Sequence, residues 1–377
     1  MKTYARTSVH EFLGDLVVYR NLTPPDERLP RLDDVREQAR VPPGVTPRKS
    51  QPAYGRVVVA LLRAARKLDA HQPALERLVY VGDTRLNDGI AFDNIARAGG
   101  WAGRAFIASE TPEPTAAEIV QSGSTVLYLA GHWGAVIDFE RFCEAQGFPI
   151  DRQTAVVVDL DKTVLGARGR NDHVINQARV EAVRRAVSGL LGRSFDRQAF
   201  RMGYDTLNQA EFHPFTADNQ DYLAYVCLIL GSGLYRLQPL LHRVRTDQMT
   251  SFAHFIAEVD EQAGKLPASL RQIHQDIYTR VQTGDPTPFK AFRYHEYQAT
   301  VERMGCLSDD LPVEDLLARE IVITQEVREA ALRWKEQGAL LFGLSDKPDE
   351  ASIPMDQLAD EGYLPIHRVE THAVGAR

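Results

Sequence analysis

Two short apolar segments of this chain each end abruptly in carboxylates, and they constrain its fold more than any other feature. One is residues 78–88, LVYVGDTRLND, and the other is residues 156–163, VVVDLDKT. Such runs are typical of buried strands in a parallel sheet, and ligands bind at the carboxyl ends of these strands. Four carboxylates at one sheet edge would repel one another unless a divalent cation and a phosphate ester neutralised them, and carboxylate oxygens suit Mg²⁺. The four are Asp83, Asp88, Asp159 and Asp161.

Both segments resemble motifs of one known family. Residues 156–163 resemble the opening motif of the haloacid dehalogenase (HAD) superfamily, an apolar strand followed by Asp-x-Asp-x-Thr. Residues 78–88 resemble its acidic motif, Gly-Asp followed shortly by Asp. Residues 339–345, ALLFGLS, are similar to the second motif, an apolar strand that ends in Ser or Thr. In most members the acidic motif comes near the end, but here it precedes the opening motif by about seventy residues. The chain therefore resembles a circularly permuted HAD protein.

The pattern along the chain predicts a core and an insertion. The 377 residues are 44% hydrophobic, which is enough for a substantial interior and two domains. Strand-like and helix-like segments alternate in residues 49–165 and 320–377, which predicts a three-layer, Rossmann-like α/β core with a mainly parallel sheet. Residues 166–319 show only helical patterns, and the resemblance implies that this all-α insertion is a cap domain. The Pro-rich residues 1–48 are expected to form an irregular extension, with one short element near residues 12–19.

The permuted order indicates where the family's essential lysine should come from. Residues 364–369 have the pattern of a strand, which we expect in the same sheet as the strand that carries Asp159. In an unpermuted relative this strand would lead into the lysine motif, so the resemblance implies a lysine near the N-terminus instead. Lys49 occupies that place. Lys347 competes with it, because it follows Ser345 by two residues in a loop at the sheet edge.

The resemblance implies distinct roles for the carboxylates. Asp159 would attack phosphorus and form an aspartyl-phosphate, which water later hydrolyses. Asp161 would protonate the leaving oxygen and then activate that water, and its backbone carbonyl would join the Mg²⁺ ligands. Asp83 and Asp88 would hold the same ion together with Asp159, directly or through water. The five-residue spacing of the acidic motif leaves open whether Asn87 or Asp88 faces the metal.

Other side chains complete the expected site. Ser345 would hydrogen-bond a phosphoryl oxygen, and the lysine would balance the charge of the carboxylates. Thr163 would support the loop after the nucleophile. Thr163, Arg168 and Arg170 follow the opening motif closely and are candidates for substrate binding, with an ordinary solvated loop as the alternative for the two arginines. Two weaker candidates in the helical insertion, where structural roles are more typical, are His213 and Asp218.

Bulk properties disfavour several partner classes. The formal net charge is −7 and the pI is about 5.9, which disfavours a nucleic-acid-binding surface. The longest apolar run, residues 222–235, is too short to span a bilayer, and the N-terminus lacks the apolar stretch of a signal peptide. The three cysteines have neither metal-ligand spacing nor a pairing signal, which fits a reducing compartment. We therefore expect a cytoplasmic protein without a membrane partner, and the sequence leaves its oligomeric state open.

The motifs together favour a Mg²⁺-dependent phosphatase that acts on a small phosphorylated metabolite. Each motif alone is as typical of a solvated turn, but three of them on buried strands point to one site. A phosphotransferase or mutase would use the same residues and is an alternative. A non-catalytic phosphate- or nucleotide-binding module is disfavoured, because pure binding needs no proton donor at Asp161. A dinucleotide-dependent dehydrogenase is disfavoured as well, because no Gly-x-Gly-x-x-Gly follows an expected strand.

Overall fold

The computed structural model divides into two compact units, which are described separately. The core unit comprises Met1–Gln177 and Thr300–Arg377, and the helical unit comprises Ala178–Ala299. The division falls inside the segment 166–319 that the sequence pattern assigned to the insertion. The structure describes residues 1–69, 71–113, 116–217 and 219–376.

A seven-stranded sheet forms the centre of the core unit. In spatial order its strands are β2 (Val17–Val18), β9 (Leu340–Leu344), β7 (Thr154–Asp159), β3 (Arg77–Gly82), β4 (Ala102–Ala108), β6 (Thr125–Ala130) and β5 (Glu118–Ser122). Neighbouring strands are parallel except for β5, which is antiparallel to β6. Strand β7, next to the central strand β3, is buried along its whole length, as expected where both faces of a sheet are covered. The predicted α/β class with a mainly parallel sheet is thus confirmed.

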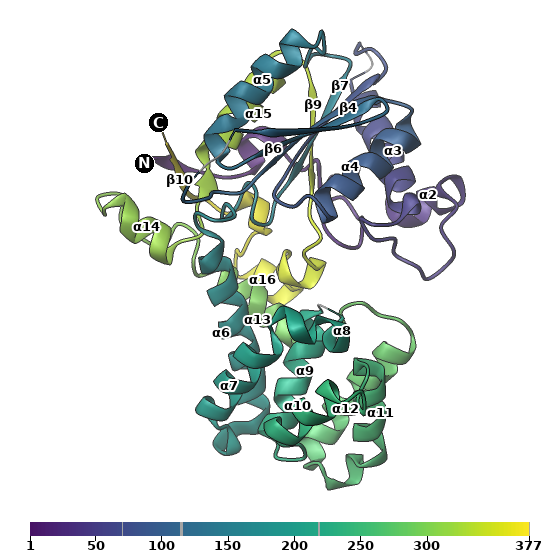
Figure 1. Ribbon diagram of the computed structural model, residues 1–377, viewed down its shortest axis with the longest axis vertical. Helices are drawn as coiled ribbons and strands as arrows, with labels where there is room; N and C mark the ends of the chain where they lie inside the picture. Colours follow the sequence, from purple (N-terminus) through teal and green to yellow (C-terminus); the bar gives the residue numbers. More distant parts are fainter. Residues whose placement is uncertain (70, 114–115, 218, 377) are drawn as a thin grey trace. The chain divides into compact units, whose positions relative to one another are not determined.

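Helices cover both faces of this sheet, so the core unit has three layers (Figure 1). On one face lie α3 (Pro52–Lys67) and α4 (Asn87–Gly99), and on the other lie α5 (Val136–Ala145) and α15 (Gln325–Glu336). The helices α3 and α4 approach closely at Gly55, where a Cβ would come within 2.2 Å of the backbone oxygen of Asn94. Glycine at this crossing therefore lets the start of α3 lie beside α4.

The end of the chain joins a second sheet, so the prediction of a main-sheet strand at residues 364–369 was wrong. This segment contains a 3₁₀ turn, Ile366–Arg368. Pro365 precedes the turn and has no N–H to donate to a strand ladder, which favours the turn over a strand. The second sheet contains β1 (Lys2–Thr7), β10 (Thr371–Gly375) and β8 (Ile323–Thr324), in that order, and two short helices of this part of the chain are α14 (Val313–Arg319) and α16 (Asp356–Asp360).

Residues 1–48 belong to the core unit and do not form the expected irregular extension. Besides β1 and β2 they contain α1 (His10–Leu13) and α2 (Leu32–Ala39). Strand β2 pairs in parallel with β9, so it takes the place in the main sheet that was expected for the chain's end. The hydroxyl of Tyr19, just after β2, lies 2.9 Å from Nδ1 of the buried His367. The N-terminal and C-terminal segments of the chain are therefore interleaved.

The helical unit is built from helices around its own apolar core. The helices are α6 (Asp172–Leu191), α7 (Arg197–Leu207), α8 (His213–Thr216), α9 (Gln220–Gly231), α10 (Leu237–Arg245), α11 (Phe252–Glu261), α12 (Ala268–Gln282) and α13 (Lys290–Val301), of which α6 and α13 cross the boundaries of the unit. Most of the longest apolar run of the sequence lies in α9, where residues 223–229 are buried. Among the described residues, no helix combines the length and apolarity that a membrane span requires.

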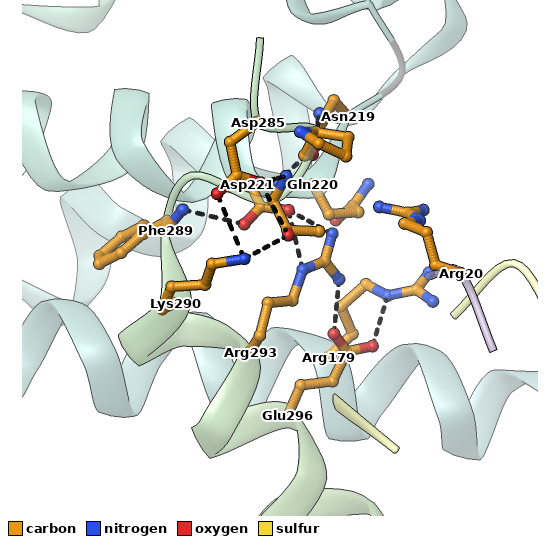
Figure 2. A network of polar contacts seen from close by, with 12 residues as sticks. Arg20, Arg179, Asn219, Gln220, Asp221, Asp285, Phe289, Lys290, Arg293 and Glu296 are labelled. Atoms are coloured by element: carbon orange, nitrogen blue, oxygen red, sulfur yellow. Dashed lines mark hydrogen bonds and ion pairs between the residues drawn. The ribbon is translucent and has the colours of Figure 1, made fainter. Parts of the chain in front are cut away.

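A network of buried ion pairs joins α9 to α13 in this unit (Figure 2). Asp221 accepts a hydrogen bond from Nε of Arg293 at 2.8 Å, and Nη1 of Arg293 donates to Glu296 at 2.6 Å. Arg179 on α6 donates to the other oxygen of Glu296 at 3.3 Å. The two carboxylates and two guanidinium groups balance in charge and meet each other's hydrogen-bonding needs. We therefore interpret this network as structural.

Candidate functional site

Three buried carboxylates meet at the carboxyl end of the main sheet. An oxygen from each of Asp83, Asp88 and Asp159 lies within 4.8 Å of the others. Asp159 is the last residue of β7, Asp83 follows directly after the neighbouring β3, and Asp88 lies in the first turn of α4. All three side chains belong to residues that are at most 8% exposed. The predicted gathering of the two motifs is therefore confirmed for these three carboxylates.

The acidic loop folds back on its own last carboxylate. Oδ2 of Asp88 accepts hydrogen bonds from the backbone N–H groups of Asp83 and Thr84, at 3.1 and 3.0 Å, and from the Thr84 hydroxyl at 2.9 Å. A Cβ at Gly82 would come within 2.7 Å of the Asp88 side chain, so this close return requires glycine. Asp88 rather than Asn87 is therefore the residue that faces the carboxylate cluster.

Lys49 supplies a cation to the cluster. Its Nζ donates to Oδ1 of Asp88 at 2.8 Å and to Oδ1 of Asp159 at 2.7 Å. The residue is 6% exposed, and its carbonyl accepts a hydrogen bond from the side chain of Asn94 on α4 at 3.0 Å. Sequence reasoning missed Tyr80, whose hydroxyl donates to Oδ1 of Asp88 at 3.0 Å. The sequence did not indicate this contact, because a tyrosine within a buried strand ordinarily packs against apolar neighbours.

Burial and charge shift the pKa values of these groups in different directions. Burial disfavours the ammonium of Lys49, but the carboxylates of Asp159 and Asp88 outweigh it and raise the pKa of Lys49 well above its usual value. Burial and the neighbouring carboxylates raise the pKa of Asp159, against the opposing effect of Lys49. Burial and the charge of Asp88 raise the pKa of Asp83 to about 7, although Arg168 opposes them. Burial and mutual repulsion therefore favour the uptake of a proton or a cation at Asp83 and Asp159.

The loop after β7 holds the Asp159 side chain in place. The hydroxyl of Thr163 donates to Oδ2 of Asp159 at 3.1 Å, and the carbonyl of Thr163 accepts from the Thr324 hydroxyl at 2.5 Å. Thr163 is fully buried, so it orients Asp159 and is not a substrate contact in this structure. Lys162 adopts a left-handed backbone conformation, φ = 65°, which closes the turn that carries Asp161. Asp161 itself is half-buried.

Ser345 and Lys347 lie on the loop after β9. Leu344 pairs in register with Asp159, so Ser345 follows at the same edge of the sheet as the carboxylates. Its backbone N–H donates to the carbonyl of Val18 at 2.9 Å, and its hydroxyl accepts from the backbone N–H of Lys347 at 3.1 Å. Both residues are buried. Of the two candidate lysines, the structure thus brings Lys49 to Asp159.

The two arginines after the opening motif differ in their surroundings. Nε of Arg168 donates to Oδ2 of Asp83, which joins Arg168 directly to the cluster. The guanidinium of Arg170 instead pairs with Glu110 and Glu326, each at 2.9 Å, and its side chain is only 3% exposed. Arg170 was expected to contact substrate, but the structure shows its charge neutralised by two glutamates inside the core unit.

Two weaker candidates come from the insertion, and the structure describes one of them. His213 is the first residue of α8 in the helical unit. Asp218 lies outside the described residues.

Comparisons of the chain with protein-family models, with curated proteins and with solved structures found no match in any of the three.

Proposed function

We propose that this protein is a Mg²⁺-dependent phosphomonoesterase of circularly permuted HAD type that hydrolyses a small phosphorylated metabolite. The observation that carries the proposal is the salt bridge of Lys49 to Asp159 and Asp88. A lysine from ahead of the acidic motif is what the permuted order requires. A cation that pairs with the nucleophile and with a carboxylate of the acidic motif is also what phosphate chemistry requires.

The chemistry of the carboxylate cluster fits a hard divalent cation. Mg²⁺ binds oxygen at about 2.1 Å, so ligands on opposite sides of the ion lie about 4.2 Å apart. The three carboxylate oxygens already lie within 4.8 Å of one another, so a small inward shift would suffice. Asp83 and Asp159 would hold the ion directly, and the Asp161 carbonyl would join them. Asp88 already accepts five hydrogen bonds, so it would contribute mainly by orienting Lys49 and the loop. When bound, Mg²⁺ would neutralise charge between the nucleophile and the substrate phosphate.

In the proposed reaction Asp159 is the nucleophile and Asp161 moves the protons. An oxygen of Asp159 attacks phosphorus while the bond between phosphorus and the leaving oxygen breaks, and Asp161 gives a proton to that oxygen. Asp161 then takes a proton from water as the water oxygen attacks phosphorus, which frees Asp159 and inorganic phosphate. Lys49 and Thr163 each donate one hydrogen bond to a different Asp159 oxygen. Both oxygens therefore keep a second lone pair for attack.

The helical unit has a defined part in this proposal. It is inserted between the strand that carries Asp159 and the strand that precedes Ser345, and the family resemblance assigns an insertion after the opening motif to a cap that selects the substrate. Its helices have a separate apolar core, which suits a unit that moves as one body.

The proposal is tested by measuring phosphate release from a panel of phosphorylated metabolites with Mg²⁺. We expect turnover by the wild type and none by Asp159→Asn. The matched control is Asp93→Asn, because Asp93 lies on α4 and accepts a hydrogen bond from Thr125 at 3.0 Å, outside the cluster. Asp161→Asn should be most impaired on substrates with poor leaving groups. Unimpaired release by Asp159→Asn would refute the aspartyl-phosphate, and transfer to an added alcohol instead of water would favour the phosphotransferase.

A further inference from the structure

We propose that the core unit carries a second binding site, for a small organic or inorganic anion, at the C-terminal end of α3. A cavity of about 520 Å³ lies there, within the range of small-molecule sites. The residues that line it include three basic side chains of the last turns of α3 and the first part of the following loop, namely Arg63, Arg66, Lys67, Asp69, Gln72 and Leu75.

Arg66 is the anchor of this site. The residue is 8% exposed, and its Nε and Nη2 atoms are buried without a hydrogen-bond partner among the described residues. A guanidinium stays charged at any physiological pH, so a buried one requires acceptors. Its two unpaired N–H groups lie in the fork that matches a carboxylate or phosphate. Arg66 therefore places a buried cation with two unpaired N–H groups among the residues that line the cavity.

Asp69 attracts the Arg66 guanidinium through its charge, but no hydrogen bond joins its carboxylate to the unpaired Nε and Nη2 atoms. Asp69 accepts hydrogen bonds from its own loop, from the backbone N–H of His71 and the side-chain amide of Gln72, each at 3.1 Å. The Gln72 carbonyl oxygen is also buried without a partner among the described residues. The site thus offers two donors from Arg66 and one acceptor from Gln72. The ligand it fits is an anion that also carries a hydroxyl or amine donor.

The site is separate from the carboxylate cluster. Helix α3 begins at Pro52, close in sequence to Lys49, and Arg66 lies fourteen residues further on, which corresponds to about 21 Å along the helix. The loop after α3 leads into the start of β3, whereas the cluster lies at the end of β3. The two sites therefore lie at opposite ends of β3. The second site does not depend on the proposed phosphatase activity.

The inference is tested by calorimetric titration of the full chain in chelator, with inorganic phosphate, glycerol phosphate and malate as separate probes. We expect saturable binding with a stoichiometry of one molecule per chain. Tighter binding of the phosphate probes would indicate a phosphate ligand, and tighter binding of the carboxylate probe would indicate a carboxylate ligand. Arg66→Met should weaken this binding at least about tenfold, and Arg66→Lys should weaken it less. Lys49→Met should leave it unchanged, because that residue serves the other site.

Two results would overturn the inference. One is the absence of saturable binding for all three probes. The other is wild-type affinity in Arg66→Met. If Arg66→Met does not fold, as judged by its circular dichroism, Arg66→Lys replaces it, because it keeps the charge and removes the guanidinium fork. Wild-type affinity in Arg66→Lys would then contradict a site built on that fork.

Discussion

The Lys49→Met substitution probes the centre of the site, because it deletes one ammonium group and keeps a side chain of similar length. In the wild type this ammonium lies 2.7 Å from Asp159 and 2.8 Å from Asp88. Removing one partner of a buried ion pair costs about 3 to 5 kcal/mol, because a charge stays buried without compensation. The variant can avoid a larger loss by protonating Asp159. From the ordinary pKa of 3.8, protonation costs about 4.4 kcal/mol at pH 7, which is therefore the upper limit of the loss. We therefore expect the free energy of unfolding to fall by about 3 to 4 kcal/mol.

The loss should depend on pH in a defined direction. Without Lys49, the pKa of Asp159 rises further above its value in the unfolded chain, and the pKa of Asp88 loses the lowering effect of the Lys49 charge. A carboxyl group with a raised folded-state pKa binds its proton more tightly in the folded protein, so the fold gains stability as the pH falls. The deficit of Lys49→Met should therefore narrow between pH 7 and pH 5, by at most about 1.4 kcal/mol per pH unit.

Urea unfolding in chelator, followed by tryptophan fluorescence, measures this deficit. The three tryptophans, Trp101, Trp133 and Trp334, all belong to the core unit, so the signal reports on the part that contains the site. Lys347→Met is the matched control, because Lys347 is buried as well. We expect it to retain phosphate release, whereas Lys49→Met loses it. Equal unfolding midpoints for Lys49→Met and the wild type at both pH values would refute the electrostatic argument. Loss of activity in the control alone would move the essential lysine to Lys347.

Three further predictions follow from other contacts. Mg²⁺ at a hundred times its dissociation constant should stabilise the wild type by about 2.7 kcal/mol, and Asp83→Asn should lose most of this gain in a thermal melt. Asp221→Ala should destabilise the helical unit by about 3 to 5 kcal/mol, because it removes one of the two carboxylates that neutralise the buried Arg293 and its neighbour Arg179; far-ultraviolet circular dichroism would detect this, with the tryptophan transition unchanged. Arg368 lowers the pKa of Asp15 to about 2. The stability that this ion pair gives to the folded protein is therefore fully present above pH 4 and is lost as the pH falls through 2. Arg368→Met should therefore cost about 1 kcal/mol at pH 7 after solvent screening, and about half as much at pH 3, in urea unfolding.

The carboxylate cluster could be predicted because its geometry follows from local patterns. Asp83 and Asp159 each end a run of buried apolar residues, and parallel strands bring such ends to one edge. Lys49 gave no local signal, since a lysine in a Pro-rich segment is ordinarily solvated. Only the permuted order of the motifs pointed to it.

The parts that sequence reasoning missed depend on partners far away in the chain. Strand β2 has two residues, too few for any periodicity, and it exists because β9 offers an open edge. The pairing of Arg170 with Glu326 spans 156 positions. The contact of Arg168 with Asp83 likewise joins two loops that only the completed sheet brings together.

The interleaved ends of the chain also determine the order in which the core unit can be completed during synthesis. Strands β3, β4, β6 and β7 leave the ribosome in one continuous stretch and can pair with each other at once. The free edge of β7 then stays unpaired until β9 is translated, which happens only after the whole helical unit. The hydroxyl of Tyr19 can contact its partner His367 only later still, because His367 lies 348 positions further along the chain. Until β9 has been translated, a nascent chain therefore exposes an unpaired apolar strand edge beside Asp159, which is the kind of edge at which chains pair wrongly and aggregate.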